Sequence, residues 1–140
     1  TAWLYGDGNN SVRTMLNLGE AKDEISVVAD QHGSPTYAED LANIIGEAIE
    51  KKIPYGVYHA TNQGYTTWFD FTKAIFEYTR TTCQVNPVTT EEYIEMMQIT
   101  QAKRPKNSQL SKDKLLAQGI TVPEREEALK RYLKAEGKLK

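Results

Sequence analysis

Two glycines near the start of the chain, Gly6 and Gly8, have a spacing that could serve cofactor chemistry. They follow a short apolar segment and precede Ser11 in the pattern Gly-x-Gly-x-x-Ser, and Asp30 ends the next apolar segment. Glycines at this spacing between a strand and a helix let the pyrophosphate of a dinucleotide approach a helix N-terminus. The third glycine, which allows the helix to pack closely on the strand, is replaced here by Ser11. We therefore interpret the segment as a tight turn before a capped helix.

Residues for proton transfer, nucleophilic attack or metal binding do not occur at useful spacings. None of the eight tyrosines is followed four residues later by lysine, so the Tyr-x-x-x-Lys acid–base pair of short-chain dehydrogenases is absent, and we predict no catalytic residue. Cys83 is the single cysteine and has no histidine near it, which favours a small buried thiol over a nucleophile. With two histidines in the chain, no metal site is expected.

The composition indicates a soluble domain and argues against two kinds of partner. Hydrophobic residues make up 39% of the 140 residues, enough for a packed core, so we expect one domain over residues 1–140. The net charge is −2 and the basic residues are interleaved with acidic ones, which argues against nucleic acid as a partner. No apolar run reaches membrane-spanning length and no signal peptide opens the chain, so we expect a cytoplasmic protein without a membrane partner.

Short strands alternate with helices in the predicted order of elements, which is typical of an α/β fold with some parallel strand pairing. The predicted strands are Thr1–Tyr5, Ile25–Asp30, Gly56–Ala60 and Cys83–Val88. The predicted helices start after Asn9 or Asn10, after Thr36, at Thr67, near Glu91, at Ser111 and at Pro123. Because the chain opens directly on a strand, we also expect it to be part of something longer.

Three of these helices carry specific expectations. Thr36 and Glu39 have the spacing of a capping box, and the helix after them carries one apolar stripe made of Leu41, Ile44, Ile45, Ala48 and Ile49. Thr67 and Asp70 are expected to begin a helix that extends to about Arg80. The last helix is predicted to turn Ala128, Leu129, Tyr132 and Leu133 inward.

Several separate segments together resemble the dTDP-4-dehydrorhamnose reductase family. They are Thr1–Gly6, with the sequence Thr-Ala-Trp-Leu-Tyr-Gly, then Val28–Thr36, Asp40–Ala42, Gly56–His59 and Ala102–Ser108. The resemblance covers nearly the whole chain in the family's order. It implies the C-terminal part of a Rossmann-type reductase that reduces a 4-keto sugar on a dTDP carrier with NADPH.

In that family the glycine-rich cofactor loop and the Tyr-x-x-x-Lys pair precede the matching region. The resemblance therefore implies a substrate-side portion that is inactive alone and binds no cofactor alone. Its expected partners are a dTDP-sugar and a missing N-terminal half that carries NADPH.

The resemblance also implies the substrate-binding residues. Trp3 takes the place of an indole near the sugar, and Gln31 and Gly33 lie in the loop before the capped helix. Arg104 is the main candidate, because a guanidinium offers a planar two-pronged donor for a diphosphate. Asn107 and Ser108 are its weaker companions.

A second hypothesis is an engineered scaffold derived from this domain. The chain has polar Ser11 and Arg125 where the family has apolar residues, as a designer would place on newly exposed surface. The sequence Trp-Phe-Asp-Phe-Thr at 68–72 also resembles an antibody-recognised helix of a retroviral envelope glycoprotein. In this reading an antibody contacts Trp68, Phe69, Phe71 and Thr72, and the discriminating observation is whether these side chains face outward.

Overall fold

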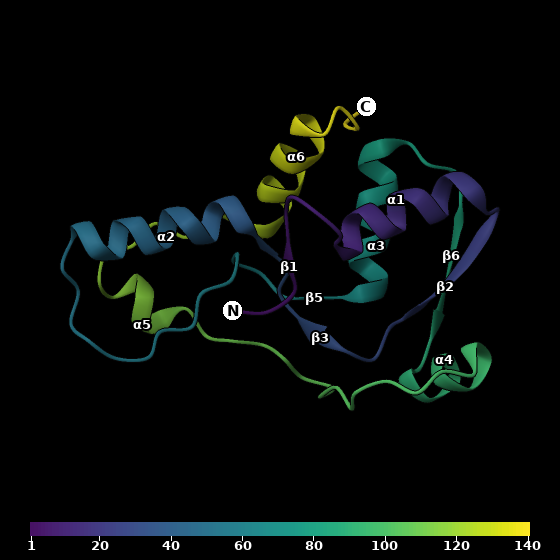
Figure 1. Ribbon diagram of the computed structural model, residues 1–140, viewed down its shortest axis with the longest axis horizontal. Coiled ribbons are helices and arrows are strands. Elements are labelled where there is room, and N and C mark those ends of the chain that lie inside the picture. The colour runs from purple at the N-terminus through teal and green to yellow at the C-terminus, as the bar shows by residue number, and fades with distance from the viewer.

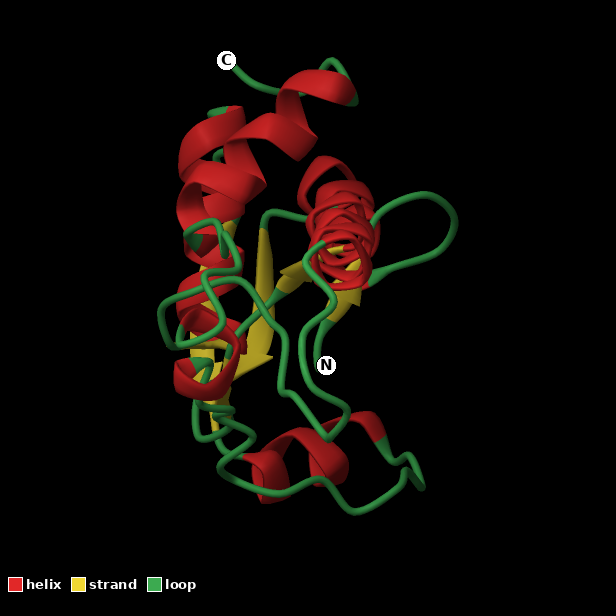
Figure 2. Ribbon diagram, turned by 90° about the vertical axis from the view of Figure 1, so that its left-hand side faces the viewer, coloured by secondary structure: helices red, strands yellow, loops and turns green.

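The computed structural model, which describes residues 1–140, contains six helices and three separate pairs of short strands (Figures 1 and 2). The β2–β6 pair lies at one edge of the molecule in Figure 1. The strands are β1 Leu4–Tyr5, β2 Glu24–Val28, β3 His32–Gly33, β4 Thr36–Tyr37, β5 Thr66–Thr67 and β6 Gln84–Val88. The helices are α1 Ser11–Ala21, α2 Ala38–Glu50, α3 Trp68–Thr79, α4 Thr90–Met97, α5 Asp113–Leu116 and α6 Arg125–Ala135. The predicted α/β class with short alternating elements is confirmed.

Strand pairing is parallel in two of the three pairs, as predicted for part of the sheet. β1 pairs with β4 and β2 pairs with β6 in parallel, whereas β3 pairs with β5 antiparallel. Pro87 lies within β6, whose one neighbour is β2, so the ring occupies a strand with a free edge. Because β1 and β2 are not neighbours, the Gly6–Ser11 turn does not belong to a dinucleotide-binding β–α–β unit.

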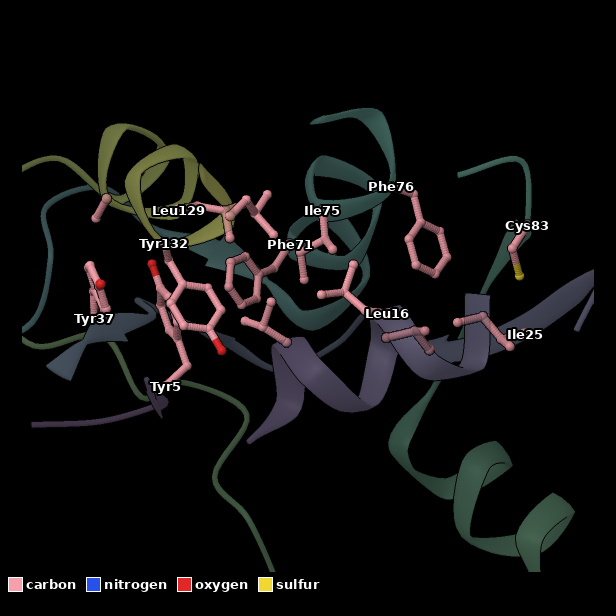
Figure 3. Packing of buried hydrophobic residues seen from close by; sticks show 14 residues of the cluster. Tyr5, Leu16, Ile25, Tyr37, Phe71, Ile75, Phe76, Cys83, Leu129 and Tyr132 are labelled. Atoms are coloured by element: carbon pink, nitrogen blue, oxygen red, sulfur yellow. The ribbon is translucent and has the colours of Figure 1, made fainter. Parts of the chain in front are cut away.

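A large hydrophobic cluster joins α1, α3, α6 and β2, and a chain of aromatic rings extends from one end of it (Figure 3). Tyr5 stacks on Tyr37 with 5.5 Å between ring centroids, and Tyr132 meets both rings edge-on. The predicted inward set of α6 is confirmed, because all four of its members are buried. Cys83 is also buried, as predicted, and burial raises the pKa of its thiol, which disfavours the nucleophilic thiolate.

A second, smaller cluster lies beneath α2 and is made of Ile44, Ala60, Leu115, Ile120 and Val122. The single apolar stripe predicted for α2 is wrong in part. Ile44 is buried, but Ile45 and Ile49 are 53% and 72% exposed. Successive helical residues are rotated by about 100°, so Ile45 and Ile49 lie to one side of Ile44. The smaller cluster covers the Ile44 side of the helix and leaves the other two side chains exposed.

Two local predictions are also wrong. Thr36 donates its hydroxyl to the Ala2 carbonyl at 2.7 Å and caps no helix, because Tyr37 takes the N-cap position of α2. Gly56–Ala60 is not a strand, because residues 54–62 form no backbone–backbone hydrogen bond with any other part of the chain. A strand requires backbone hydrogen bonds to a neighbouring segment, and this segment forms none within the chain.

The other predicted helix starts are close to those observed. Asn10 accepts a hydrogen bond from the Arg13 N–H and caps α1, and Thr67 caps α3 in the same way through the Asp70 N–H. Ser111 accepts from the Asp113 N–H just before α5, and α6 begins two residues after Pro123. No helix of this fold combines the length and the apolar character needed to cross a bilayer.

Candidate functional site

The loop at residues 103–108 is fixed to β3 by backbone hydrogen bonds. The His32 N–H donates to the Lys106 carbonyl at 2.8 Å, and the Ser108 N–H donates to the His32 carbonyl at 2.7 Å. This pairing brings a loop that is distant in the sequence beside Gln31 and Gly33. The structure therefore brings the predicted loop and the predicted strand-end residues together.

Arg104 lies at the junction of two neighbouring pockets. The first, which we call the aromatic pocket, has a volume of about 250 Å³ and is lined by Trp68, Tyr93, Gln31 and Arg104, with Ser11, Met15, Ser26, Val27, Val28 and Gln101. The second, which we call the basic pocket, has a volume of about 350 Å³ and is lined by Lys103, Arg104, Lys106 and residues of α4. Arg104 and Gln101 line both pockets.

The basic side chains of this loop have no acidic partner. None of the seven salt bridges of the chain involves Lys103, Arg104 or Lys106, although most other arginines of the chain are paired. Glu91 also lines the basic pocket, so three cations face one carboxylate there. An excess of exposed cations around a pocket favours an anionic ligand. The Arg104 guanidinium can donate two hydrogen bonds to an anionic group at the junction of the two pockets.

Trp3 does not line the aromatic pocket and contacts the site through Trp68. Its indole stacks on Trp68 with 3.9 Å between centroids and 21° between planes. Its backbone has a φ of 51°, in the left-handed region that is costly for a bulky residue. Gly33 gives the indole its space, because a Cβ atom there would lie 2.8 Å from the Trp3 Cζ2 atom.

Gln31 links the site to the start of α4. Its side-chain amide donates to the Thr90 hydroxyl at 3.1 Å, and Asp30 accepts from both the N–H and the hydroxyl of Thr90. These contacts anchor the first turn of α4 to the end of β2, so that Tyr93 lines the aromatic pocket.

Asn107 and Ser108 line neither pocket. The Asn107 side chain accepts a hydrogen bond from the Gln109 N–H and closes a local turn, and Ser108 holds the loop to β3 through its backbone. Their position near Arg104 is as expected, but the contacts observed for them support the loop itself.

Several residues of the site were missed by sequence reasoning. Trp68 was considered as an antibody contact and not as a stacking partner of Trp3. No motif in the sequence marks Tyr93, Thr90 or Gln101 as site residues. Their part in the site depends on how α4 and the loop after it pack against β2. A cap at Thr89, which accepts from the Glu92 N–H, was the available clue to where α4 begins.

The structure corrects the predicted antibody contacts. Phe71 and Thr72 are 2% and 1% exposed, because they face the large cluster beneath α3. Trp68 and Phe69 are half-buried and also pack against that cluster. An antibody therefore cannot contact Phe71 or Thr72 while α3 remains packed.

The Gly6–Ser11 turn does not fit a nicotinamide dinucleotide. The Gly8 carbonyl accepts hydrogen bonds from Arg13 and Asn10, and the Asn10 side chain caps α1, so side chains of the protein occupy the entrance to the helix N-terminus. No cluster of three or more metal-binding side chains occurs in the structure.

A family model, curated proteins and solved structures that resemble this chain all point to one family. The family described as "RmlD substrate binding domain" matches residues 1–137. The spore coat polysaccharide biosynthesis protein SpsK of Bacillus subtilis is 41% identical over 95% of this chain and 45% of its own length. A dTDP-4-dehydrorhamnose reductase from Clostridium acetobutylicum superposes with a TM-score of 0.88 at 43% identity, over 97% of this chain and 47% of that one.

Another solved relative was crystallised with a bound ligand. The dTDP-4-dehydrorhamnose reductase of Bacillus anthracis, solved in complex with NADP, is 44% identical with a TM-score of 0.84, over 95% of this chain and 45% of that one. The chain thus spans about half the length of the relatives that it matches.

Proposed function

Because this chain belongs to the RmlD substrate-binding domain family, we propose that residues 1–140 form one substrate-binding unit for a dTDP-4-keto-6-deoxyhexose. The observation that carries the proposal is the unpaired Arg104 at the junction of the aromatic and basic pockets. The guanidinium binds the diphosphate, and the Trp68 indole offers an apolar face to one end of the ligand. The two pockets together have the size of a small-molecule site.

The unit binds and orients its ligand but does not reduce it alone. It contains no Tyr-x-x-x-Lys pair, and its one glycine-rich turn is closed by Arg13 and Asn10. NADPH and the proton donor are then supplied by another half of the enzyme, in keeping with the relative solved with NADP. The isolated chain, mixed with NADPH and the 4-keto sugar, is expected to oxidise no NADPH in an absorbance assay. Measurable oxidation would overturn this part of the proposal.

No contact in the structure favours the hypothesis of an engineered scaffold that an antibody recognises. Only Trp68 and Phe69 remain partly accessible, and Trp68 is held against Trp3 beside the pocket. That position suits a ligand site.

A titration of dTDP, followed by ¹⁵N NMR, tests the site. We expect shift changes at residues of the aromatic pocket and of the 103–108 loop. Arg104→Ala should weaken binding by about tenfold or more, because hydrogen bonds to a charged group contribute about 1.5–3 kcal/mol. Arg104→Lys should recover part of the affinity, since it keeps the charge and loses the two-pronged geometry. Binding of dTMP should be weaker than that of dTDP and less sensitive to Arg104→Ala.

Arg80→Ala is the matched control. Arg80 is an exposed, unpaired arginine at the far end of α3 and lines neither site pocket. Its loss should leave the dTDP affinity unchanged. Shifts that are equal in Arg104→Ala and the wild type would remove Arg104 from the site, and a chain without any shifts would overturn the proposed function.

A further inference from the structure

Helix α4 is amphipathic in sequence, but none of its side chains is buried. Tyr93, Ile94 and Met97 share one side of the helix, because Met97 follows the other two by three and four residues. Tyr93 and Ile94 are half-buried, and Met97 is 52% exposed. An amphipathic helix normally packs its apolar side on a core. The apolar side of α4 therefore has room for a further contact.

This apolar side borders the two pockets that meet at Arg104. Tyr93 lines the aromatic pocket, opposite the body of the chain, and Ile94 lines the basic pocket. Among the helices and strands, α4 packs mainly on β2, and in Figure 1 it lies apart from the other helices. Any movement of α4 relative to β2 therefore changes the width of both pockets.

The first turn of α4 is fixed to the end of β2. The Asp30 carboxylate accepts hydrogen bonds from the Thr90 N–H at 3.0 Å and from the Thr90 hydroxyl at 2.7 Å. The Thr89 hydroxyl accepts from the Glu92 N–H and caps the helix. These bonds hold the start of the helix in place and make Thr90 a suitable pivot.

The other end of α4 has no comparable attachment. The helix ends at Gln98 with a φ of 50°, in the left-handed region. Residues 99–105 form no backbone–backbone hydrogen bond, and no side-chain hydrogen bond involves them. None of the seven salt bridges includes a glutamate of α4. A segment with so few hydrogen bonds and so little buried surface opens at a low free-energy cost.

We propose that residues 91–105 form a flap that closes over a nucleoside diphosphate bound at Arg104. The helix turns about Thr90, and residues 98–105 are the flexible arm that allows the movement. Closure places Tyr93 and Ile94 against the ligand and Arg104 against its diphosphate. This inference rests on the proposed function, to which it adds that binding and closure are coupled.

The position and charge of the flap identify the ligand as the group that it covers. Arg104 belongs to the flap and lines both pockets, so one segment carries both the apolar and the cationic contacts. Lys103, Arg104 and Lys106 face one carboxylate, that of Glu91, in the basic pocket. The excess positive charge opposes closure until an anion neutralises it. A ligand shifts an equilibrium towards the state with which it makes more contacts, which here is the closed one.

Hydrogen exchange with and without dTDP tests the flap. In the free chain the helical amides of residues 94–97 should exchange faster than those of residues 75–79 in α3, whose side chains are largely buried. Saturating dTDP should slow the exchange of 94–97 by about tenfold or more, together with that of 103–108. Exchange of 94–97 that is as slow as in α3 without ligand would overturn the proposal, because α4 would then be closed already.

The dissociation rate of dTDP separates a flap from a static wall. Tyr93→Ala should raise this rate by about tenfold and leave the association rate nearly unchanged, since a closed flap retains the ligand after it has bound. Tyr93→Phe keeps the ring and should dissociate like the wild type. A stopped-flow measurement gives both rates, and an unchanged dissociation rate in Tyr93→Ala would contradict closure over the ligand.

Met96→Ala is the matched control. Met96 is a large, exposed apolar side chain of the same helix and lines neither pocket. Its loss should change neither the dissociation rate nor the protection of 94–97 by dTDP. A rise in the dissociation rate equal to that of Tyr93→Ala would show a general loss of helix stability and would overturn the specific role of the apolar side.

The exchange experiment also distinguishes this inference from the proposed function. If saturating dTDP protects 103–108 while 94–97 exchanges at its free rate, the flap is wrong and the substrate site stands. If dTDP protects neither segment, the proposed function fails, and the flap fails with it.

Discussion

Trp3 and Gly33 show how a single pair of residues shapes the aromatic pocket. The Trp3 backbone is held in a left-handed conformation, and the indole fills the space above Gly33 while it stacks on Trp68. Such strain persists only where surrounding contacts compensate for it. The position of the Trp68 ring, which lines the pocket, therefore depends on Gly33 of β3.

Gly33→Ala should displace the Trp3 indole and disturb the pocket. The new methyl group would lie 2.8 Å from Cζ2 of Trp3, so the ring must shift. We expect a loss of about 1–3 kcal/mol in the free energy of unfolding, as for other overpacked sites, together with a changed tryptophan fluorescence spectrum and weaker dTDP binding. Urea unfolding and the NMR titration measure these effects.

Gly46→Ala is the control for that substitution. A Cβ atom at Gly46 meets no atom within 4 Å, and the residue lies inside α2. Alanine should therefore stabilise the protein by about 0.5–1 kcal/mol through helix propensity alone. Equal effects of the two substitutions would argue against a steric role for Gly33.

At the scale of the elements, the start of α3 serves both the fold and the site. Thr67 accepts a hydrogen bond from the Asp70 N–H and caps the helix, and it also pairs with His32 between β5 and β3. Trp68 is the first residue of the helix and is therefore positioned by the same cap. The 103–108 loop is bound to His32 as well, so one short antiparallel pair connects the aromatic side of the site to its basic side.

Thr67→Ala should cost about 1 kcal/mol of stability, the usual effect of removing an N-cap hydroxyl. Thr67→Ser keeps the oxygen and should recover most of that loss. Thr14→Ala serves as the control, because Thr14 lies exposed within α1 and its hydroxyl bonds back to Asn10, so alanine should be neutral or slightly stabilising. Thermal unfolding of the four proteins compares them, and no rescue by serine would contradict the capping role.

At the scale of the whole molecule, a buried polar network joins the two hydrophobic clusters. Asp40 of α2 accepts hydrogen bonds from Asn62 at 2.7 Å and from Arg131 of α6 at 2.8 Å, and Asn62 in turn accepts from the Tyr37 N–H. Asp40 and Asn62 are 2% and 1% exposed, so these groups depend on one another for hydrogen bonds. The network holds α2 against the large cluster through the aromatic chain of Tyr5, Tyr37 and Tyr132.

This aromatic chain predicts a loss of stability in alkali. Burial, with a contribution from Glu39, raises the pKa of Tyr37 to about 12. In the unfolded chain the phenol ionises at about pH 10, so between these values the unfolded state binds fewer protons and the free energy of unfolding falls. The stabilisation is complete below about pH 10 and is lost as the pH rises towards about 12.

Urea unfolding of the wild type and of Tyr37→Phe, at about pH 9 and about pH 11.5, checks the effect. The wild type should lose about 1–2 kcal/mol more than the variant over this interval, since phenylalanine cannot ionise. Burial raises the pKa of Tyr5 as well, so the variant should retain part of the dependence. Identical losses in both proteins would contradict the assignment to Tyr37.

Local patterns in the sequence were enough to predict much of the fold. The caps at Asn10 and Thr67, the α/β alternation and the inward face of α6 follow from hydrogen bonds and periodicities within one or two turns of chain. The resemblance to the reductase family pointed to Arg104, and the structure places this residue at the junction of two pockets.

Contacts between distant segments decided the rest. Thr36 has the sequence of a cap but hydrogen-bonds to Ala2, and Trp68 becomes part of the pocket only because Trp3 stacks on it. Residues 56–60 have the composition of a strand but find no neighbour within the chain. The sequence alone thus determined where helices begin and which side chains can face inward, because those choices depend on nearby backbone groups. Only the tertiary structure decided which surfaces meet and which stay bare, because a hydrogen-bond ladder or an apolar contact forms only when a second segment is present to share it.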